Sequence, residues 1–313
     1  MNNYKFEDIE SCECIGFFDE YVYDIEVDDN THTFIANDIL VHNSCYLAFG
    51  EVLDKCNWTG TIKDFILEIY NKRLKKYIEN ILQEYADNNN TENYLNFELE
   101  SIAKSAIWLA KKKYMQDLIW KDPDISFESL TKIKSKGFEI IQSSTPQFAR
   151  EKLKELLKYI FSVEDVKISE MVKYLKKIKQ QFKLANLEHI SQNLSINNYK
   201  KYILNDRKEF TIEKRCPLHV RGSGYHNYLL YNSKFKNKYN LIADGEKVKI
   251  YYTTDKVCNI FSYIAGSYPY EFAPPMDYEL QFEKTIIDPI NRVIAAIGLQ
   301  TLDRNLIYSS SLF

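Results

Sequence analysis

Three consecutive residues, His42, Asn43 and Ser44, bring together an imidazole, a carboxamide and a hydroxyl. An asparagine side-chain nitrogen can attack its own backbone carbonyl, close a succinimide ring and break the peptide bond to Ser44. A neighbouring histidine can donate a proton to the departing group, and a serine hydroxyl becomes a nucleophile when a base or a carboxylate activates it. The tripeptide could therefore cleave the chain after Asn43. Taken alone, such a tripeptide is most often part of a surface loop.

Short strands are expected on the N-terminal side of this tripeptide. Residues 21–27 alternate with the period of two of a strand, and residues 32–35 and 39–41 form two further short apolar runs. Turn residues at 28–31 and 36–38 separate the three runs. A segment of this length cannot fold alone without cross-links, and its strand edges would be unpaired. The pattern predicts that a partner supplies the rest of the sheet.

The net charge of −3 over 313 residues is the sum of two opposite parts. Residues 1–43 hold eleven acidic residues and one lysine, which gives −10 and leaves +7 for residues 44–313. The acidic head favours a cationic partner, and the basic body favours a polyanion such as nucleic acid. A solvated acidic tail is the alternative for the head. The length of the chain predicts roughly two domains.

Several classes of protein are disfavoured by composition. The sequence has no run of 18 apolar residues and no basic N-terminus followed by an apolar stretch, which argues against a membrane span and a secretory signal. We therefore expect a cytoplasmic protein whose six cysteines are reduced. Cys12 and Cys14, and likewise Cys216 and His219, lack further partners at ligand spacing, so no bound metal is expected at either pair.

The rest of the chain mixes helical and strand patterns. Apolar spacings near three and four predict a helix over residues 62–85. Two lysine-rich helices are expected further on, one that ends at about residue 161 and one over about 169–184. Strands are expected at residues 96–102, 107–114 and 115–120, with a hairpin at residues 241–253 around Asp244-Gly245. The helix after Gln142 is expected to start with Ser144 or Thr145 as its cap and Pro146 at its first position.

The string from residue 21 to residue 44 resembles the C-terminal splicing blocks of inteins in order and spacing. The blocks that begin an intein are missing, so residues 1–43 resemble the C-terminal piece of a split intein. This implies a β-rich part of a HINT-like fold that is completed in trans. The resemblance implies five splicing residues: Asn43, which cyclises; His42 and His32, which assist; Asp24, which helps to activate the nucleophile; and Ser44, which accepts the upstream flank.

The body resembles the family B DNA polymerases, notably those of large tailed phages. Five stretches carry the resemblance: Ser44-Cys45-Tyr46-Leu47, which follows the palm motif Asp-Thr-Asp; Ala110 to Tyr114, which resembles the Lys-Lys-x-Tyr segment; two thumb segments, Gln142 to Pro146 and Cys216 to Gly222; and Ser310 to Phe313, which resembles the sliding-clamp tether. The implied fold class is α+β and multi-domain, with the late part of the palm at 44–140 and a mostly helical thumb at 141–313.

The polymerase resemblance implies further site residues. DNA-binding roles are implied for Lys111, Lys112, Lys113, Tyr114 and Arg221, and a clamp-binding role for Leu312 and Phe313. A solvated basic strand edge is the alternative for the lysine run, and a disordered end for the tail. Glu98 and Glu100 share a strand face in the expected structure and align with carboxylates near the metals; an exposed face is the alternative.

Together the two resemblances imply the C-terminal half of a split DNA-directed DNA polymerase. Trans-splicing would join it to an N-terminal half, which carries the Asp pair that binds most of the Mg²⁺, so this chain alone would be inactive as a polymerase. The splicing step needs no cofactor. The implied partners are primer-template DNA, dNTPs and a sliding clamp. No interaction with a membrane is expected. The alternative is a DNA- and clamp-binding module whose intein is inactive or was truncated from a contiguous one.

Overall fold

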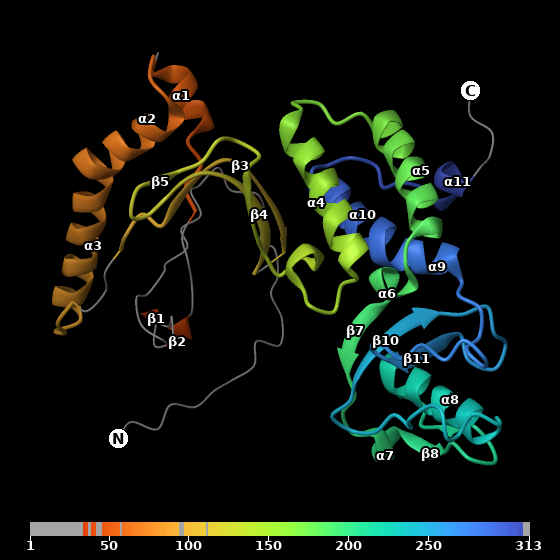
Figure 1. The fold of residues 1–313 in the computed structure, drawn as a ribbon. Coiled ribbons are helices and arrows are strands. Elements are labelled where there is room, and N and C mark those ends of the chain that lie inside the picture. Colours follow the sequence, from red (N-terminus) through yellow and green to blue (C-terminus); the bar gives the residue numbers. More distant parts are fainter. Residues whose placement is uncertain are drawn as a thin grey trace. The chain divides into compact units, whose positions relative to one another are not determined.

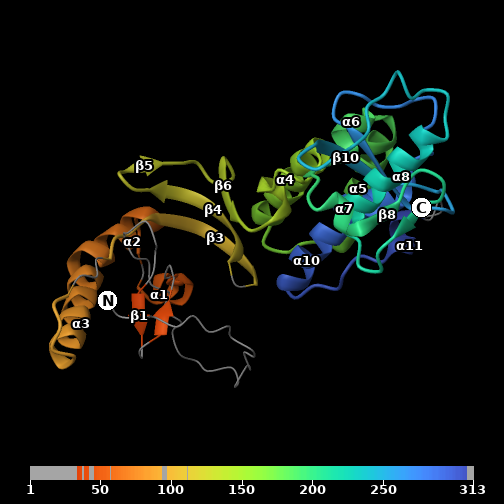
Figure 2. The same ribbon diagram turned by 90° about the horizontal axis from the view of Figure 1, so that it is seen from below.

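The computed structural model describes residues 34–36, 39–41, 46–56, 58–93, 97–110 and 112–308. The chain divides into two compact units, residues 1–102 and residues 103–313, and each unit is described by itself (Figures 1 and 2). Helices and antiparallel strands both occur, which agrees with the predicted α+β class at the level of secondary structure. In the described parts of the chain, no helix is long and apolar enough to cross a membrane.

The first unit contains a short hairpin and a long, interrupted helix. Strands β1 (Phe34–Ala36) and β2 (Ile39–Val41) pair in antiparallel fashion, with Phe34 opposite Val41. The predicted strand at 39–41 is confirmed. Of the strand predicted at 32–35, residues 34 and 35 belong to β1, and residues 32 and 33 lie outside the described residues. The strand predicted at 21–27 lies outside the described residues.

The predicted helix at 62–85 is confirmed, although it is not a single regular α-helix. After the short α1 (Gly50–Lys55), the chain forms α2 (Ile62–Ile69), a π-helical turn η1 (Tyr70–Leu74) and α3 (Lys75–Asn88). Helix α2 begins where it does because the Thr61 hydroxyl accepts a hydrogen bond from the Asp64 backbone N–H at 3.1 Å.

A small antiparallel sheet follows, with β4 at its centre. Its strands are β3 (Ser101–Ala110), β4 (Lys113–Lys121), β5 (Ile125–Ser126) and β6 (Lys132–Lys136). The strand expected at 96–102 begins only at Ser101. The Tyr70 hydroxyl donates to the Phe97 carbonyl and accepts from the Leu99 N–H, both at 3.2 Å. These backbone groups are therefore directed to a side chain and not to a neighbouring strand.

The remainder of the second unit combines helices with a second sheet. Helices α4 (Gln147–Ser162) and α5 (Ile168–Leu184) lie beside α10 (Asp288–Ala296), and α8 (Leu218–Tyr231) covers one face of the sheet β11-β10-β7 (Figure 1). The strands of this sheet are β7 (Gln192–Ser195), β10 (Lys247–Tyr252) and β11 (Ile260–Ile264). The shorter elements are α6 (Leu187–Ile190), α7 (Tyr199–Tyr202), β8 (Ile203–Asn205), β9 (Thr211–Ile212), η2 (Glu139–Ile141), α9 (Tyr278–Phe282), η3 (Glu283–Ile287) and α11 (Arg304–Tyr308).

One continuous core joins the helices and the sheets of the second unit. Leu153 and Leu156 of α4, Ile178 and Phe182 of α5, and Phe282 of α9 are almost completely buried in it. The two helices expected in this region are confirmed, and each turns one apolar face into the core.

Two local predictions were wrong. Helix α4 has Pro146 as its N-cap, with no side-chain cap, because the chain is still extended at Pro146 with ψ 145°. Asp244-Gly245 forms a turn but no hairpin, since no strand precedes it. Strand β10 instead pairs with β7, about fifty residues earlier, and with β11. The turn caps α7 instead, because the Asp244 carboxylate accepts a hydrogen bond from the Tyr199 N–H at 2.7 Å.

Candidate nucleic-acid interface

The lysine run at 111–113 lies at the tight turn between β3 and β4. Lys112 adopts a left-handed conformation with φ 60°, and Lys113 is the first residue of β4. Both side chains are exposed, whereas Lys111 lies outside the described residues. The run was expected to lie within a strand, but of its described residues Lys112 lies in the turn and only Lys113 belongs to a strand. A turn projects its side chains beyond the end of the sheet, where they are accessible to a polyanion.

Gly137 holds this turn in place from the far side of the hairpin. A β-carbon on Gly137 would lie 2.5 Å from the Lys112 carbonyl oxygen and 2.9 Å from Lys113 Cγ. Gly137 also has φ 66°, a conformation that other residues rarely adopt. A glycine is thus required at this point for the chain after β6 to pack against the lysine turn.

Tyr114 follows the turn but does not present its ring to solvent. Its side chain is only 6% exposed, so it packs within the sheet and cannot offer a face on which a base could stack. In the ladder Tyr114 is paired with Lys136, and Gln116 with Lys134. The geometry assigns Tyr114 to positioning the turn.

A row of lysines along β6 extends the basic surface from the turn. Lys132, Lys134 and Lys136 are paired with Leu118, Gln116 and Tyr114, so all three lie on the same sheet face as those partners. Lys132 and Lys136 are exposed. The sequence reading missed this row. The alternation Lys-Ile-Lys-Ser-Lys at residues 132–136 has the period of a strand and could have indicated it.

The buried carboxylate of Asp117 does not weaken this positive surface. Asp117 is completely buried on the opposite face of β4, where it accepts hydrogen bonds at 2.6 Å from the Ser129 hydroxyl and from the Leu130 N–H. These bonds fix the connection that leads into β6. Asp117 therefore positions the lysine row while its charge is satisfied inside the protein.

Arg221 lies in the first turns of α8, at a different place in the second unit. Its Nη2 donates to the Asn259 side-chain oxygen at 2.8 Å, and its buried Nε has no hydrogen-bond partner among the described residues. The neighbouring Gly222 allows α8 to approach β11, because a β-carbon there would lie 2.5 Å from Ser262 Oγ. A close helix–sheet contact and one neutral partner thus orient a guanidinium that forms no ion pair with any of the described residues.

The cysteine and the histidine beside Arg221 are both partly buried. Burial raises the pKa of the Cys216 thiol to about 11 and lowers the pKa of His219. The His219 carbonyl accepts hydrogen bonds from the hydroxyls of Ser223 and Ser262. In the part of the chain that the structure describes, no group of three His, Cys, Asp or Glu side chains could hold a metal ion.

Glu98 and Glu100 lie in the irregular segment before β3, so the prediction that they share a strand face was wrong. Glu98 is exposed and Glu100 is half-buried. Tyr70 binds the backbone on either side of Glu98, and this contact places the two carboxylates next to the π-helical turn of the first unit.

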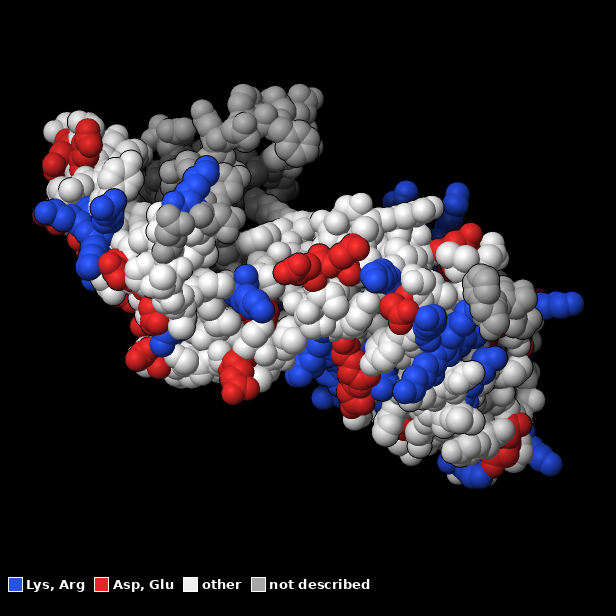
Figure 3. Space-filling view, turned by 90° about the horizontal axis from the view of Figure 1, so that it is seen from above, with Lys and Arg blue, Asp and Glu red and all other residues white. Residues whose placement is uncertain are grey.

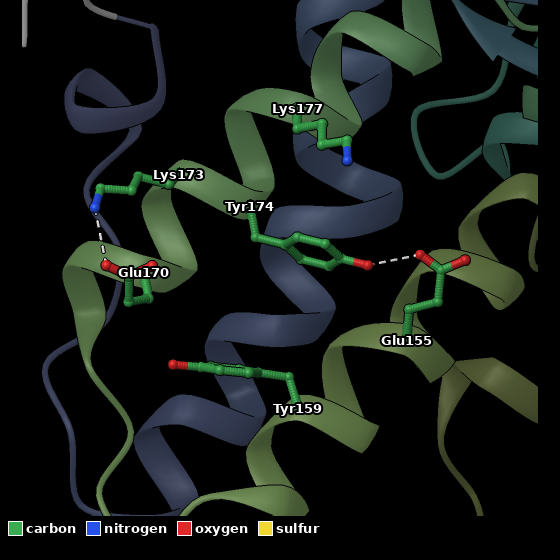
Figure 4. A pocket seen from close by; sticks show the side chains of 6 residues that line it. All are labelled: Glu155, Tyr159, Glu170, Lys173, Tyr174 and Lys177. Carbon is green, nitrogen blue, oxygen red and sulfur yellow. Dashed lines mark hydrogen bonds and ion pairs between the residues drawn. The ribbon is translucent and has the colours of Figure 1, made fainter.

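An open pocket lies between α4 and α5 (Figure 4). Its lining residues are Glu155, Tyr159, Glu170, Lys173, Tyr174 and Lys177. The Tyr174 hydroxyl donates to Glu155 at 2.7 Å, and Lys173 pairs with Glu170 at 2.9 Å. Burial and this hydrogen bond raise the pKa of Tyr174 to about 12. Each carboxylate is thus matched by a donor, which makes the pocket a poor site for phosphate.

On the face drawn in Figure 3, lysine and arginine side chains are interspersed with acidic ones. The exposed side chains of the lysine turn and of the lysine row on β6 are candidates for phosphate contacts.

The predicted splicing and clamp-binding residues lie outside the described residues. These are Asp24, His32, His42, Asn43, Ser44, Leu312 and Phe313. Their roles stay predictions from the sequence.

Comparisons with known proteins find no matching family model. The chain is 26% identical over 283 residues to the DNA-directed DNA polymerase of Escherichia phage RB69, and the matched region covers 82% of this chain and 30% of that protein. It is 25% identical over 185 residues to the DNA-directed DNA polymerase of Enterobacteria phage T4, covering 54% of this chain and 19% of that protein. A DNA polymerase of Thermococcus hydrothermalis is 28% identical over 191 residues, covering 61% of this chain and 10% of that protein.

The chain thus spans less than a third of the length of each of these relatives. The similarity is distant, but it covers more than half of the chain in each comparison. The chain contains a region related to DNA-directed DNA polymerases.

Proposed function

We propose that the chain is the C-terminal half of a split, intein-interrupted family B DNA polymerase. The observation that carries the polymerase part is the exposed Lys112-Lys113 turn, continued by the lysine row of β6, in a chain that is similar to DNA polymerases over most of its length. The splicing part rests on the residue order from Asp24 to Ser44. In this proposal residues 1–43 are excised, and residues 44–313 supply the late palm and the thumb.

The splicing reaction proceeds on the proposed partner and on this chain together. The upstream flank, activated as a thioester or ester on the N-terminal half, is transferred to Ser44 Oγ, which forms a new ester and releases the activating group. The Asn43 side-chain nitrogen then attacks its own carbonyl, assisted by His42 and His32, and the bond to Ser44 breaks. The freed amine of Ser44 attacks the ester, and the flank shifts to a stable amide.

In the joined enzyme the lysine turn holds the phosphates of the primer-template. Lys112 and Lys113 are accessible, and Arg221 is oriented by Asn259 without losing its charge. Lysine and arginine contacts to phosphates release counterions and supply affinity that is independent of base sequence. Tyr114 contributes by packing beneath the turn.

The Mg²⁺ that nucleotidyl transfer requires is bound mainly by the Asp pair of the partner half. The described residues do not provide a metal site by themselves. Glu98 and Glu100 are the carboxylates of this chain that we place near the metals after assembly. When bound, the metal ions stabilise the attacking and leaving oxygens of the phosphoryl group.

The C-terminal tail starts from a well-anchored helix. Arg304 of α11 pairs with Glu283 at 3.1 Å, and Ile307 is buried. Leu302, just before α11, exchanges two hydrogen bonds with the Asn291 side chain. An anchored start supports the proposal that the last residues, with Leu312 and Phe313, reach out to a sliding clamp.

Mixing this chain with the N-terminal half from the same genome tests the proposal. Mass spectrometry should detect a ligated product that lacks both intein pieces, and primer extension should appear only after mixing. Asn43→Ala should abolish ligation, and a ligated product that still forms would refute the cyclisation role. DNA binding that weakens with salt, without any ligation, would instead favour a DNA- and clamp-binding module with an inactive or truncated intein.

A further inference from the structure

Helix α3 of the first unit carries a stripe of exposed apolar side chains. Tyr77, Ile81 and Tyr85 are 60%, 44% and 46% exposed. They are four residues apart and therefore share one face of the helix. Leu74, Ile78 and Leu82 flank them and are only half-buried. In a globular protein such a stripe normally faces a core, yet in α3 these side chains are exposed; Figures 1 and 2 show the course of the helix.

Few apolar side chains are buried among the described residues of the first unit. Among its described residues, the buried apolar side chains are Phe65, Ile66, Ala86 and Ile102. None of these belongs to the large core of the second unit. Three large apolar side chains exposed together on one helix face are typical of a protein interaction surface.

We propose that the stripe of Tyr77, Ile81 and Tyr85 is the docking surface for the polymerase half on the partner chain. The inference rests on the proposed split polymerase. The relative from phage RB69 is matched over 30% of its length, so the other 70% has no counterpart in this chain and is available to cover the stripe. The two aromatic side chains and the isoleucine suit a protein core better than nucleic acid. The halves therefore bind each other through this helix as well as through their intein pieces.

Two contacts on one chain raise the effective concentration of each. Docking of the intein pieces would place the partner near the stripe, and docking at the stripe would hold the spliced halves in register. The interaction should therefore persist when the intein segment of the partner is absent.

Binding of the full chain to the N-terminal half, prepared without its intein segment, tests this inference. The variant Tyr77→Lys/Ile81→Lys should weaken binding at least about tenfold, as expected when two apolar anchors are lost from a hot spot. The control Asn80→Lys/Gln83→Lys adds the same charge to exposed positions off the stripe and should bind within about twofold of the natural chain. Circular dichroism should show that both variants stay folded, since all four positions are exposed.

Three results would overturn the inference. Equal affinities of the two double variants would show that the stripe does not dock the partner. So would the absence of binding by the natural chain. A dimer of the natural chain alone, abolished by Tyr77→Lys/Ile81→Lys in sedimentation velocity, would assign the stripe to a second copy.

Ligation with the intact partner separates this inference from the proposed function. If ligation proceeds and both double variants bind equally, only the docking surface is wrong. If ligation fails while the stripe variant alone weakens binding, the splicing proposal is wrong and the docking surface stands.

Discussion

The backbone of Gly137 lies directly against that of Lys112, so that a β-carbon on Gly137 would come within 2.5 Å of the Lys112 carbonyl oxygen. The two residues are brought together by the pairing of β4 with β6, which places Tyr114 opposite Lys136. The exposed lysine turn is thus supported by a backbone contact between segments that are separated along the chain. The first prediction tests this support.

Gly137→Ala should weaken binding to a primer-template duplex as well as stability. The new methyl group must displace the Lys112 carbonyl, and alanine at φ 66° costs about 1–2 kcal/mol. Gly266→Ala is the matched control, because Gly266 has φ 78° but no atom within 4 Å of the added carbon. Fluorescence anisotropy should show lower DNA affinity for Gly137→Ala only. Equal affinities of the two variants would disconnect Gly137 from the DNA surface.

Removing the turn lysines should change how DNA binding depends on salt. Each phosphate contact contributes about 0.9 to the slope of log affinity against log salt. Lys112→Ala and Lys113→Ala should therefore each reduce the slope by about 1. Lys72→Ala removes a charge that is paired with Glu68 at 2.8 Å in the first unit, and it should leave the slope unchanged. A uniform effect of all three variants would indicate attraction by net charge alone.

Arg221 and Asn259 allow charge and orientation to be separated. Arg221→Ala removes the charge and should lower both the DNA affinity and the salt slope, the latter by about 1. Asn259→Ala keeps the charge but loses the 2.8 Å hydrogen bond that orients the guanidinium. Asn259→Ala should lower the DNA affinity with little change of the salt slope. Titrations of DNA binding across about 50–200 mM salt measure both quantities. If Asn259→Ala binds DNA as the natural chain does, the hydrogen bond has no part in binding.

The buried His226 should make the second unit less stable in mild acid. Burial lowers the pKa of His226 to about 4, although its ring nitrogens lie 3.0 and 3.3 Å from the Ser262 and Asn240 carbonyls. In the unfolded chain the pKa is about 6.5, so below that pH the unfolded state binds the proton more readily. This contribution to the free energy of unfolding should fall by about 2 kcal/mol between pH 7 and pH 5.

Chemical denaturation of the natural chain and of His226→Gln at both pH values measures that contribution. The variant should be less stable at pH 7 but should lose less stability on acidification. Other histidines are common to both chains, so the difference between their pH dependences reports His226 alone. Identical pH dependences would show that His226 does not stay neutral in the folded protein.

The helices were predictable because their signal is local. The apolar spacing over residues 62–85 and 169–184 follows the helical period, and the structure places α2, α3 and α5 there. The hairpin around Asp244-Gly245 was not predictable in the same way. Its turn chemistry was read correctly, but β10 takes its partners from distant segments. The choice of strand partner is a tertiary property.

The candidate DNA surface was predictable only in part. Lys112, Lys113 and Arg221 were identified as residues, but neither the left-handed turn at Lys112 nor the burial of Tyr114 follows from residue type. A lysine seldom adopts φ 60°, and here its neighbour is Gly137, which lies 25 positions later in the sequence.

The sequence by itself determined the properties that depend on covalent neighbours and on composition. The adjacency of His42, Asn43 and Ser44, and the division into a −10 head and a +7 body, hold whatever the chain folds into. The tertiary structure alone decided which lysines share a sheet face, which neutral side chain orients Arg221, and which apolar stripe on α3 stays uncovered. Each of these depends on contacts between distant segments, and the pairing of such segments is set by the packing of the whole domain.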